Sequence, residues 1–150
     1  MLLAAGLVSQ VAIGVCIAQD TFTHPKRAIV GTPGPDTIRG GPGADRIFGR
    51  DGDDRIVSGP GPDLVSGDRG ADTLSGGAGG DVILGGGGND RLVGGSGRDL
   101  LLGGNSDDSI RARDGAVDTI SCGPGRDRVI ADRIDHVRRD CELKRLLGPR

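Results

Sequence analysis

An aspartate recurs at every ninth residue through the middle of this chain. The series is Asp36, Asp45, Asp54, Asp63, Asp72, Asp81, Asp90, Asp99 and Asp108. Carboxylate oxygens are ligands that hard divalent cations prefer, and neighbouring glycines leave backbone carbonyl oxygens accessible as further ligands. Carboxylates stacked close together repel unless a cation lies between them. The spacing therefore predicts metal sites, provided that the fold brings successive aspartates together.

The aspartates belong to a nonapeptide repeat that runs without insertion over residues 31–111. Its nine units are GTPGPDTIR, GGPGADRIF, GRDGDDRIV, SGPGPDLVS, GDRGADTLS, GGAGGDVIL, GGGGNDRLV, GGSGRDLLL and GGNSDDSIR. The sixth position is always aspartate, the eighth is always aliphatic, and the fourth is glycine in eight of the nine units. We interpret each unit as a six-residue glycine-rich turn followed by a three-residue strand whose middle side chain points inward.

Two such units make one coil of a solenoid. The pattern predicts an all-β protein, a right-handed parallel β-roll in which the eighth-position side chains of two sheets form the core. Each turn then stacks on the turn 18 residues further on, which gives up to seven inter-turn sites for the nine turns. One edge would hold Asp36, Asp54, Asp72, Asp90 and Asp108, and the other Asp45, Asp63, Asp81 and Asp99. The turns of Asp45, Asp63, Asp81 and Asp99 are the best preserved, which favours the sites on their edge.

The units resemble the nonapeptide repeat of haemolysin-type calcium-binding, or repeats-in-toxin, proteins. GGAGGDVIL and GGGGNDRLV are close to that pattern, whereas Thr32, Arg50, Ser58, Asp68 and Ser106 replace glycines of it. The resemblance implies a parallel β-roll and several Ca²⁺ ions, each held by sixth-position carboxylates and turn carbonyls of two stacked units. The core of one aliphatic residue per unit is small, which favours a structural metal. The alternative is that the aspartates only cap the turns by accepting backbone N–H groups, without metal.

The first residues are predicted to direct export. Residues 2–18 are apolar or small apart from Ser9 and Gln10, and a polar stretch follows. We interpret residues 1–18 as a signal peptide and residues 19–30 as a linker, which predicts a secreted or cell-surface protein. An uncleaved anchor and a lipoprotein cut before Cys16 are the alternatives.

Beyond Arg111 the nine-residue register slips. The triplets Asp118-Thr119-Ile120 and Asp127-Arg128-Val129 repeat the aspartate and aliphatic signature, so we interpret residues 112–141 as degenerate repeats and a C-terminal cap, with an irregular last coil or a short helix over residues 132–141. Cys122 and Cys141 are 19 residues apart, about one coil, and are expected to form a disulfide that closes this end. Residues 142–150 are expected to form a flexible tail.

Composition narrows the function classes. The 150 residues include 30 glycines and 8 prolines but no tryptophan or tyrosine, and the formal net charge is −2. Nucleic-acid binding is not expected, because it needs a clustered basic footprint. The sequence contains no catalytic constellation, so an enzyme is not expected either.

One outer face of the predicted β-roll is apolar. Even-numbered units place Phe48, Leu64, Val82, Leu84, Leu100 and Leu102 at their seventh and ninth positions. Because an apolar patch of this length normally marks an interface, we expect the N-terminal segment, the C-terminal tail or a second copy to cover it, or a surface partner to bind there.

Taken together, these features predict an exported calcium-binding β-solenoid that folds on extracellular calcium and acts as a structural or surface-interaction module. The alternative is a repeat-containing fragment of a larger secreted toxin or enzyme.

Overall fold

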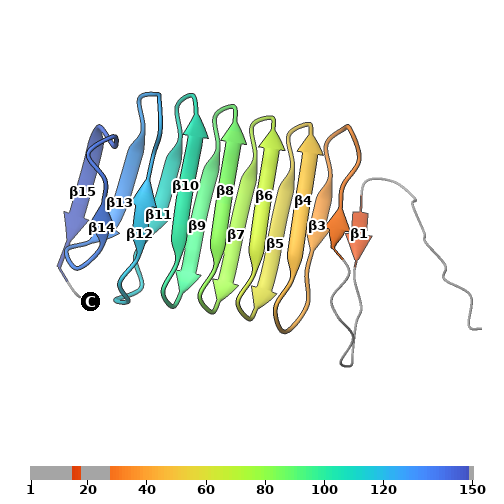
Figure 1. Cartoon of the computed structure of the whole chain (residues 1–150), viewed down its shortest axis with the longest axis horizontal. Coiled ribbons are helices and arrows are strands. Elements are labelled where there is room, and N and C mark those ends of the chain that lie inside the picture. The colour runs from red at the N-terminus through yellow and green to blue at the C-terminus, as the bar shows by residue number, and fades with distance from the viewer. Residues whose placement is uncertain (1–14, 18–27, 149–150) are drawn as a thin grey trace, which may run out of the picture.

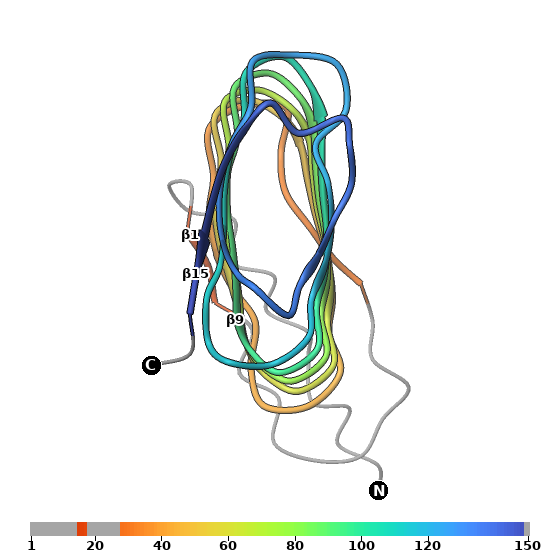
Figure 2. The same cartoon turned by 90° about the vertical axis from the view of Figure 1, so that its left-hand side faces the viewer.

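The chain winds into a flattened solenoid of two parallel β-sheets (Figures 1 and 2). The computed structural model describes residues 15–17 and 28–148. Sheet A has eight strands in the order β1-β3-β5-β7-β9-β11-β13-β15, and sheet B has seven in the order β14-β12-β10-β8-β6-β4-β2. The strands are β1 (Val15–Ile17), β2 (Ile29–Val30), β3 (Thr37–Arg39), β4 (Arg46–Asp51), β5 (Arg55–Pro60), β6 (Leu64–Arg69), β7 (Thr73–Ala78), β8 (Val82–Gly87), β9 (Arg91–Ser96), β10 (Leu100–Asn105), β11 (Ser109–Ala112), β12 (Thr119–Ser121), β13 (Arg128–Asp132), β14 (His136–Val137) and β15 (Leu143–Leu147).

Successive coils stack in register, as the sequence predicted. Ile38 lies beside Ile56, which lies beside Leu74, so each repeat unit pairs with the unit 18 residues away. Odd-numbered units begin the strands of sheet A, and even-numbered units begin those of sheet B. The all-β parallel solenoid with two repeats per coil is therefore confirmed.

The strands are longer than the sequence suggested. Strands β4 to β10 each have six residues, comprising positions seven to nine of one unit and one to three of the next. Gly59, Gly77 and Gly95 lie in one ladder with φ near 117°, and a Cβ atom on Gly77 would overlap the Gly59 carbonyl oxygen. Glycine normally weakens strands, but here it allows the stacked backbones to approach closely enough to pair. The expected six-residue turn is therefore reduced to positions four to six.

Three positions of each unit point into the solenoid, because side chains alternate along a strand. The eighth-position side chains from Ile38 to Ile110 are fully buried, and Ile120 and Val129 continue this core in the later coils. The sixth-position aspartate and the first-position residue flank each aliphatic side chain on the inside. The interior is therefore a narrow apolar column bordered by carboxylates at both turns.

The C-terminal region forms an irregular last coil, which was one of the two alternatives for the cap, but it does not end in the expected flexible tail. The described residues contain no capping helix between residues 132 and 141, where the chain forms β14 instead. Residues 143–147, expected in the flexible tail, form β15 and pair with β13 in sheet A (Figure 1). An open strand edge on β13 offers unpaired backbone groups, which explains why a segment without the repeat signature adds to the sheet.

At the N-terminal end, β1 pairs with β3 in sheet A. Its residues 15–17 fall within the predicted signal peptide, whereas residues 1–14 and 18–27 lie outside the described part of the chain. Residues 15–17 and 28–148 contain no helix long and apolar enough to cross a bilayer.

The predicted apolar side chains lie together on the outer face of sheet B. Leu64, Val82 and Leu100 form one column, and Leu84 and Leu102 are neighbours in a second. Each is only half-buried, as is Phe48. Because β15 lies in sheet A, the C-terminal tail does not cover this face, which overturns that expectation.

Candidate metal centre

The sixth-position aspartates form two ladders inside the turns. In each rung, the backbone N–H of one aspartate donates to Oδ1 of the aspartate in the next coil, over 2.6–3.0 Å. One ladder contains Asp36, Asp54, Asp72, Asp90 and Asp108, and the other Asp45, Asp63, Asp81 and Asp99. The structure thus brings all nine predicted residues together in the two sets expected.

The ladders extend beyond the nine predicted members. Asp127 follows Asp108 in the first ladder, and Asp118 and Asp135 follow Asp99 in the second. The signature of aspartate followed two residues later by an aliphatic residue identifies all three, including Asp135-His136-Val137. Asp118 and Asp127 lie in the predicted degenerate repeats but were not among the predicted metal ligands, and Asp135 was not recognised, because the first-position glycine and the nine-residue spacing are lost in this region.

The second carboxylate oxygen behaves differently from the first. In the first two units, Oδ2 of Asp36 and Asp45 accepts a backbone N–H from the second position of its own unit. In later coils Oδ2 is buried and has no hydrogen-bond partner among the described residues, at Asp54, Asp72, Asp81, Asp90, Asp99, Asp108, Asp118 and Asp127. A buried carboxylate oxygen without a partner is unfavourable, so either a proton or a bound cation would stabilise these atoms.

The carboxyl pKa values reflect this burial. Loss of solvent raises the pKa to about 6 in Asp54, Asp81 and Asp108 and to about 7 in Asp90 and Asp118. The ladder hydrogen bond lowers each pKa and the neighbouring carboxylates raise it, but both effects are smaller than desolvation. Desolvation also raises the pKa of Asp72, Asp99 and Asp135. Near neutral pH, the metal-free interior therefore resists becoming fully ionised.

Seven of the eight first-position glycines, all except Gly94, leave room for two oxygen atoms that converge. A Cβ atom built on Gly85 would overlap both Oδ2 of Asp90 and the carbonyl oxygen of Gly103 in the next coil. The same arrangement occurs at Gly49, where the two oxygens belong to Asp54 and Gly67. Only glycine fits at these positions, because the two oxygens occupy the space that a Cβ atom would need. The reason is not a positive backbone φ, since neither Gly49 nor Gly85 has one. We call this feature, a buried Oδ2 facing the carbonyl of the next coil, the glycine cradle.

The donor set of the glycine cradle fits a hard cation. It combines an ionisable carboxylate oxygen with a backbone carbonyl oxygen, which are ligands that Ca²⁺ takes in sets of six to eight. Among residues 15–17 and 28–148, no group of three or more His, Cys, Asp or Glu side chains surrounds a common point. Backbone carbonyl oxygens, which glycine-rich turns make accessible, are the further ligands that these turns offer to an ion.

Ser58 is the exception among the regular units. It takes the first position of its unit, and its Oγ donates to the carbonyl oxygen of Gly76, 2.5 Å away. Gly76 is the first-position residue of the next coil, so a hydroxyl group occupies the space that is open in neighbouring units. The cradle next to Asp63 is thus filled by a side chain.

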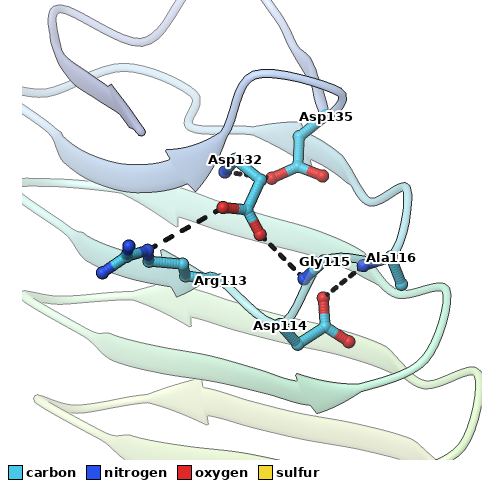
Figure 3. Close-up of polar contacts among 6 residues, drawn as sticks. All are labelled: Arg113, Asp114, Gly115, Ala116, Asp132 and Asp135. Atoms are coloured by element: carbon cyan, nitrogen blue, oxygen red, sulfur yellow. Dashed lines mark hydrogen bonds and ion pairs between the residues drawn. The ribbon is translucent and has the colours of Figure 1, made fainter. Parts of the chain in front are cut away.

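The C-terminal coils are closed by contacts of another kind. Cys122 and Cys141 form a disulfide with Cα atoms 5.1 Å apart, as their spacing predicted. On the same coils, Oδ1 of Asp132 lies 3.8 Å from Nε of Arg113, and its Oδ2 accepts the N–H of Gly115 (Figure 3). Asp135 accepts the N–H of Asp132 and thereby connects the last turn to this group.

Parallel stacking, two buried aspartate ladders and glycine cradles define a calcium-binding-type β-solenoid. Comparison with known proteins agrees, because the family model of the RTX calcium-binding nonapeptide repeat matches residues 30–65, 57–92, 66–101, 84–117 and 93–129. These matches span two thirds of the chain, which therefore belongs to the RTX calcium-binding repeat family. No match was found among curated proteins or among solved structures.

Proposed function

We propose that this protein is an exported β-solenoid module that folds when calcium binds to its two aspartate ladders. Membership of a calcium-binding repeat family supports calcium as the ligand. The buried, unpartnered Oδ2 atoms and the raised carboxyl pKa values support a role for the ion in folding rather than at the surface alone.

A second, outer ladder supports a need for charge at the sixth position. At the fifth position, Asp53, Asn89 and Asp107 accept backbone N–H groups from the next coil. Asparagine serves there as well as aspartate, because only an acceptor oxygen is required. The sixth position is aspartate in every regular unit, although asparagine could accept the same hydrogen bond. This contrast is the observation that carries the proposal, because turn capping alone does not account for it.

In the proposed module, bound calcium supplies positive charge between successive turns. The chain supplies the sixth-position carboxylates and the first-position carbonyl oxygens, and Oδ1 keeps its hydrogen bond to the neighbouring coil. Because the stacked turns exist only in the folded chain, binding and folding are coupled.

Circular dichroism of the mature protein, titrated with calcium and with excess chelator, tests the proposal. We expect a largely disordered spectrum in chelator and β-structure as calcium reaches the high micromolar to millimolar range that extracellular modules use. Magnesium at the same concentrations is the control, because it keeps its own water ligands and demands a stricter octahedral geometry. A β-rich spectrum in chelator that calcium leaves unchanged would contradict the proposal.

The variant Asp90→Asn separates metal binding from turn capping. The amide keeps an acceptor for the N–H of Asp72 but removes the charge. We expect weaker calcium binding and a folding transition at higher calcium, whereas the matched surface variant Asp107→Asn leaves both unchanged. If capping were the whole role, Asp90→Asn would be neutral or stabilising, since it removes a carboxyl that burial disfavours.

The apolar face of sheet B supports an interaction role. A shallow groove of about 650 Å³ runs beside it, lined by Arg46, Leu64, Val82 and the turns that precede them. We propose that this face contacts a second copy or a surface partner. Sedimentation of the double variant Leu84→Lys with Leu100→Lys tests this. An unchanged oligomer size together with unchanged calcium-dependent folding would contradict the proposed interface.

We also propose that the protein is exported and is not an enzyme. Detection of the mature protein in the medium or at the cell surface, with its N-terminus after Ala18, would support the predicted signal peptide. The rival is a repeat-containing fragment of a larger secreted toxin or enzyme, and an open reading frame extending well past either end would favour it.

A further inference from the structure

The outer face of sheet A carries a row of arginines. They occupy seventh and ninth positions, on the side of each strand opposite the buried aliphatic residue, and all six side chains are exposed. None of them forms an ion pair with another residue in the described ranges. We call this set, comprising Arg39, Arg55, Arg91, Arg111, Arg128 and Arg145, the arginine face.

The parallel register arranges these charges along the solenoid axis. Arg55, Arg91 and Arg128 lie in the seventh-position column, each separated from the next by one strand that carries Thr73 or Ser109. Two strand spacings correspond to about 10 Å, and the six steps from β3 to β15 correspond to roughly 29 Å. Figure 1 shows these strands side by side along the long axis. In the seventh-position column, guanidinium groups thus alternate with hydroxyl groups along the axis.

Few acids balance this positive charge on the same side. The ladder aspartates point into the solenoid, and the acids near the row lie at its borders. They are Asp53 and Asp107, in the turns before β5 and β11, and Glu142, which lines a groove with Arg128 and Arg145 at the C-terminal end. The chain as a whole has a formal net charge of −2, so the basic character is confined to one face. Two bound calcium ions would change that formal charge from −2 to +2, which strengthens attraction for an anion.

We propose that the arginine face binds a linear acidic polysaccharide lying along the solenoid axis. This binding site is separate from the apolar face of sheet B and adds a partner class to the module; it rests on the calcium-folded solenoid proposed above. Guanidinium groups pair with carboxylate and sulfate groups through two parallel hydrogen bonds. The threonine and serine hydroxyls between them can bond to sugar hydroxyls, and a flat, extended sheet presents these groups to successive units of an extended chain.

Other polyanions fit the face less well. Single-stranded nucleic acids are held by aromatic side chains that stack on bases, and the arginine face contains none. Its apolar members Val57, Val93 and Ile130 are half-buried between longer side chains, so no apolar group projects that could enter a bilayer. An uninterrupted polymer with regularly repeated charge is the ligand whose chemistry the array matches.

Binding of the full-length mature protein to dextran sulfate in millimolar calcium tests the proposal, with uncharged dextran as the matched polymer. The test variant is Arg91→Gln with Arg111→Gln on the face. The control is Arg98→Gln with Arg126→Gln, two exposed turn arginines whose loss changes the net charge equally. We expect the face variant to weaken binding about tenfold and the control less than about twofold.

The outcomes separate this proposal from calcium-dependent folding. Circular dichroism of each sample shows whether the solenoid has formed, so a failure of folding is seen independently of binding. Equal loss of affinity in the two double variants, or equal binding to uncharged dextran, would overturn the arginine face as the site. Tighter binding to phosphatidylglycerol vesicles or to single-stranded DNA than to dextran sulfate would overturn the assigned ligand class.

Discussion

The regular coils (residues 31–111) and the closing coils (residues 112–141) fill the interior with different residues at the first position of each unit. In residues 31–111 this position is glycine apart from Ser58, and the space beside it holds a carboxylate oxygen and a carbonyl oxygen. In residues 112–141 it is Ala112, Cys122 and Ala131, whose side chains are fully buried, and Cys141 stacks on Cys122. The regular coils therefore keep a polar interior that a cation can complete, whereas the closing coils fill the same space with apolar atoms and a covalent bond.

The largest expected difference appears when pH is varied in chelator. Burial raises the pKa of Asp54, Asp81 and Asp108 to about 6 and that of Asp90 to about 7, against 3.8 in the unfolded chain. These groups favour the folded state fully below pH about 4, and this contribution is lost as pH rises through 6 to 7. We therefore expect the metal-free repeats to gain β-structure on acidification.

Calcium should reverse this pH dependence, because it binds the ionised carboxylates. Circular dichroism and hydrogen exchange between pH 4 and pH 8, with and without calcium, measure both branches. Metal-free protein that is more ordered at pH 8 than at pH 4.5 would contradict the buried, protonated ladders.

Removal of the disulfide should weaken the closing coils next. The double variant Cys122→Ser with Cys141→Ser is expected to lower the free energy of unfolding by about 3 kcal/mol, the chain-entropy value for a loop of this size. Urea unfolding in saturating calcium measures the change, and reduction of the wild-type protein is the matched treatment. The calcium stoichiometry should stay the same, since Cys122 contributes only its backbone carbonyl oxygen to the cradle at Gly103 and the substitutions change side chains alone. A change in stoichiometry would show that the two regions are not independent.

Substitutions at the first position test the difference between the regular and the closing coils directly. Gly85→Ala places a methyl group against Oδ2 of Asp90 and the Gly103 carbonyl, so it should cost about 1–3 kcal/mol through overpacking and reduce calcium binding. Ala112→Gly removes a buried methyl group and should cost about 1 kcal/mol without affecting calcium. Calorimetric titration together with urea unfolding distinguishes the two. Equal effects on calcium binding would refute the cradle.

The smallest expected effect is a gain in stability at Asp68. This residue has φ of 73° in the second position, where glycine is usual, and its Oδ1 accepts the hydroxyl of Ser66. Asp68→Gly should raise the unfolding free energy by about 1 kcal/mol because it removes backbone strain. Asp68→Ala is the control, since it deletes the carboxylate but keeps the unfavourable φ. In thermal unfolding with calcium, the midpoint temperature of Asp68→Gly should be higher than that of the wild type, and the midpoint temperature of Asp68→Ala should be lower.

Much of the architecture could be predicted from residue spacing. A strict nine-residue register specifies which aspartates stack, because parallel in-register coils repeat every two units, and the 19-residue spacing of Cys122 and Cys141 identifies the disulfide. The length of the strands could not be predicted, since the glycines that lengthen them are typical of turns. Their pairing depends on close contact between coils, a tertiary effect that overrides local preference.

The contacts of the last coils could not be predicted from the sequence either. Arg113 and Asp132 are one 19-residue coil apart, as Cys122 and Cys141 are, but this spacing alone does not indicate which polar side chains pair across the coils. Likewise, β15 has neither the aspartate nor the glycine of the repeat and is held by the edge that β13 presents.

The hydrogen bonds of the aspartate ladders all point the same way, and this gives the molecule chemically distinct ends. Every rung runs from an N–H donor in one coil to a carboxylate acceptor in the next coil toward the C-terminus. Copies that joined end to end could therefore continue the ladders only head to tail, a heterologous arrangement that produces open filaments. The disulfide-linked coils and β15 interrupt the repeat at one end. The closing segment that completes the fold would therefore also block head-to-tail addition at this end.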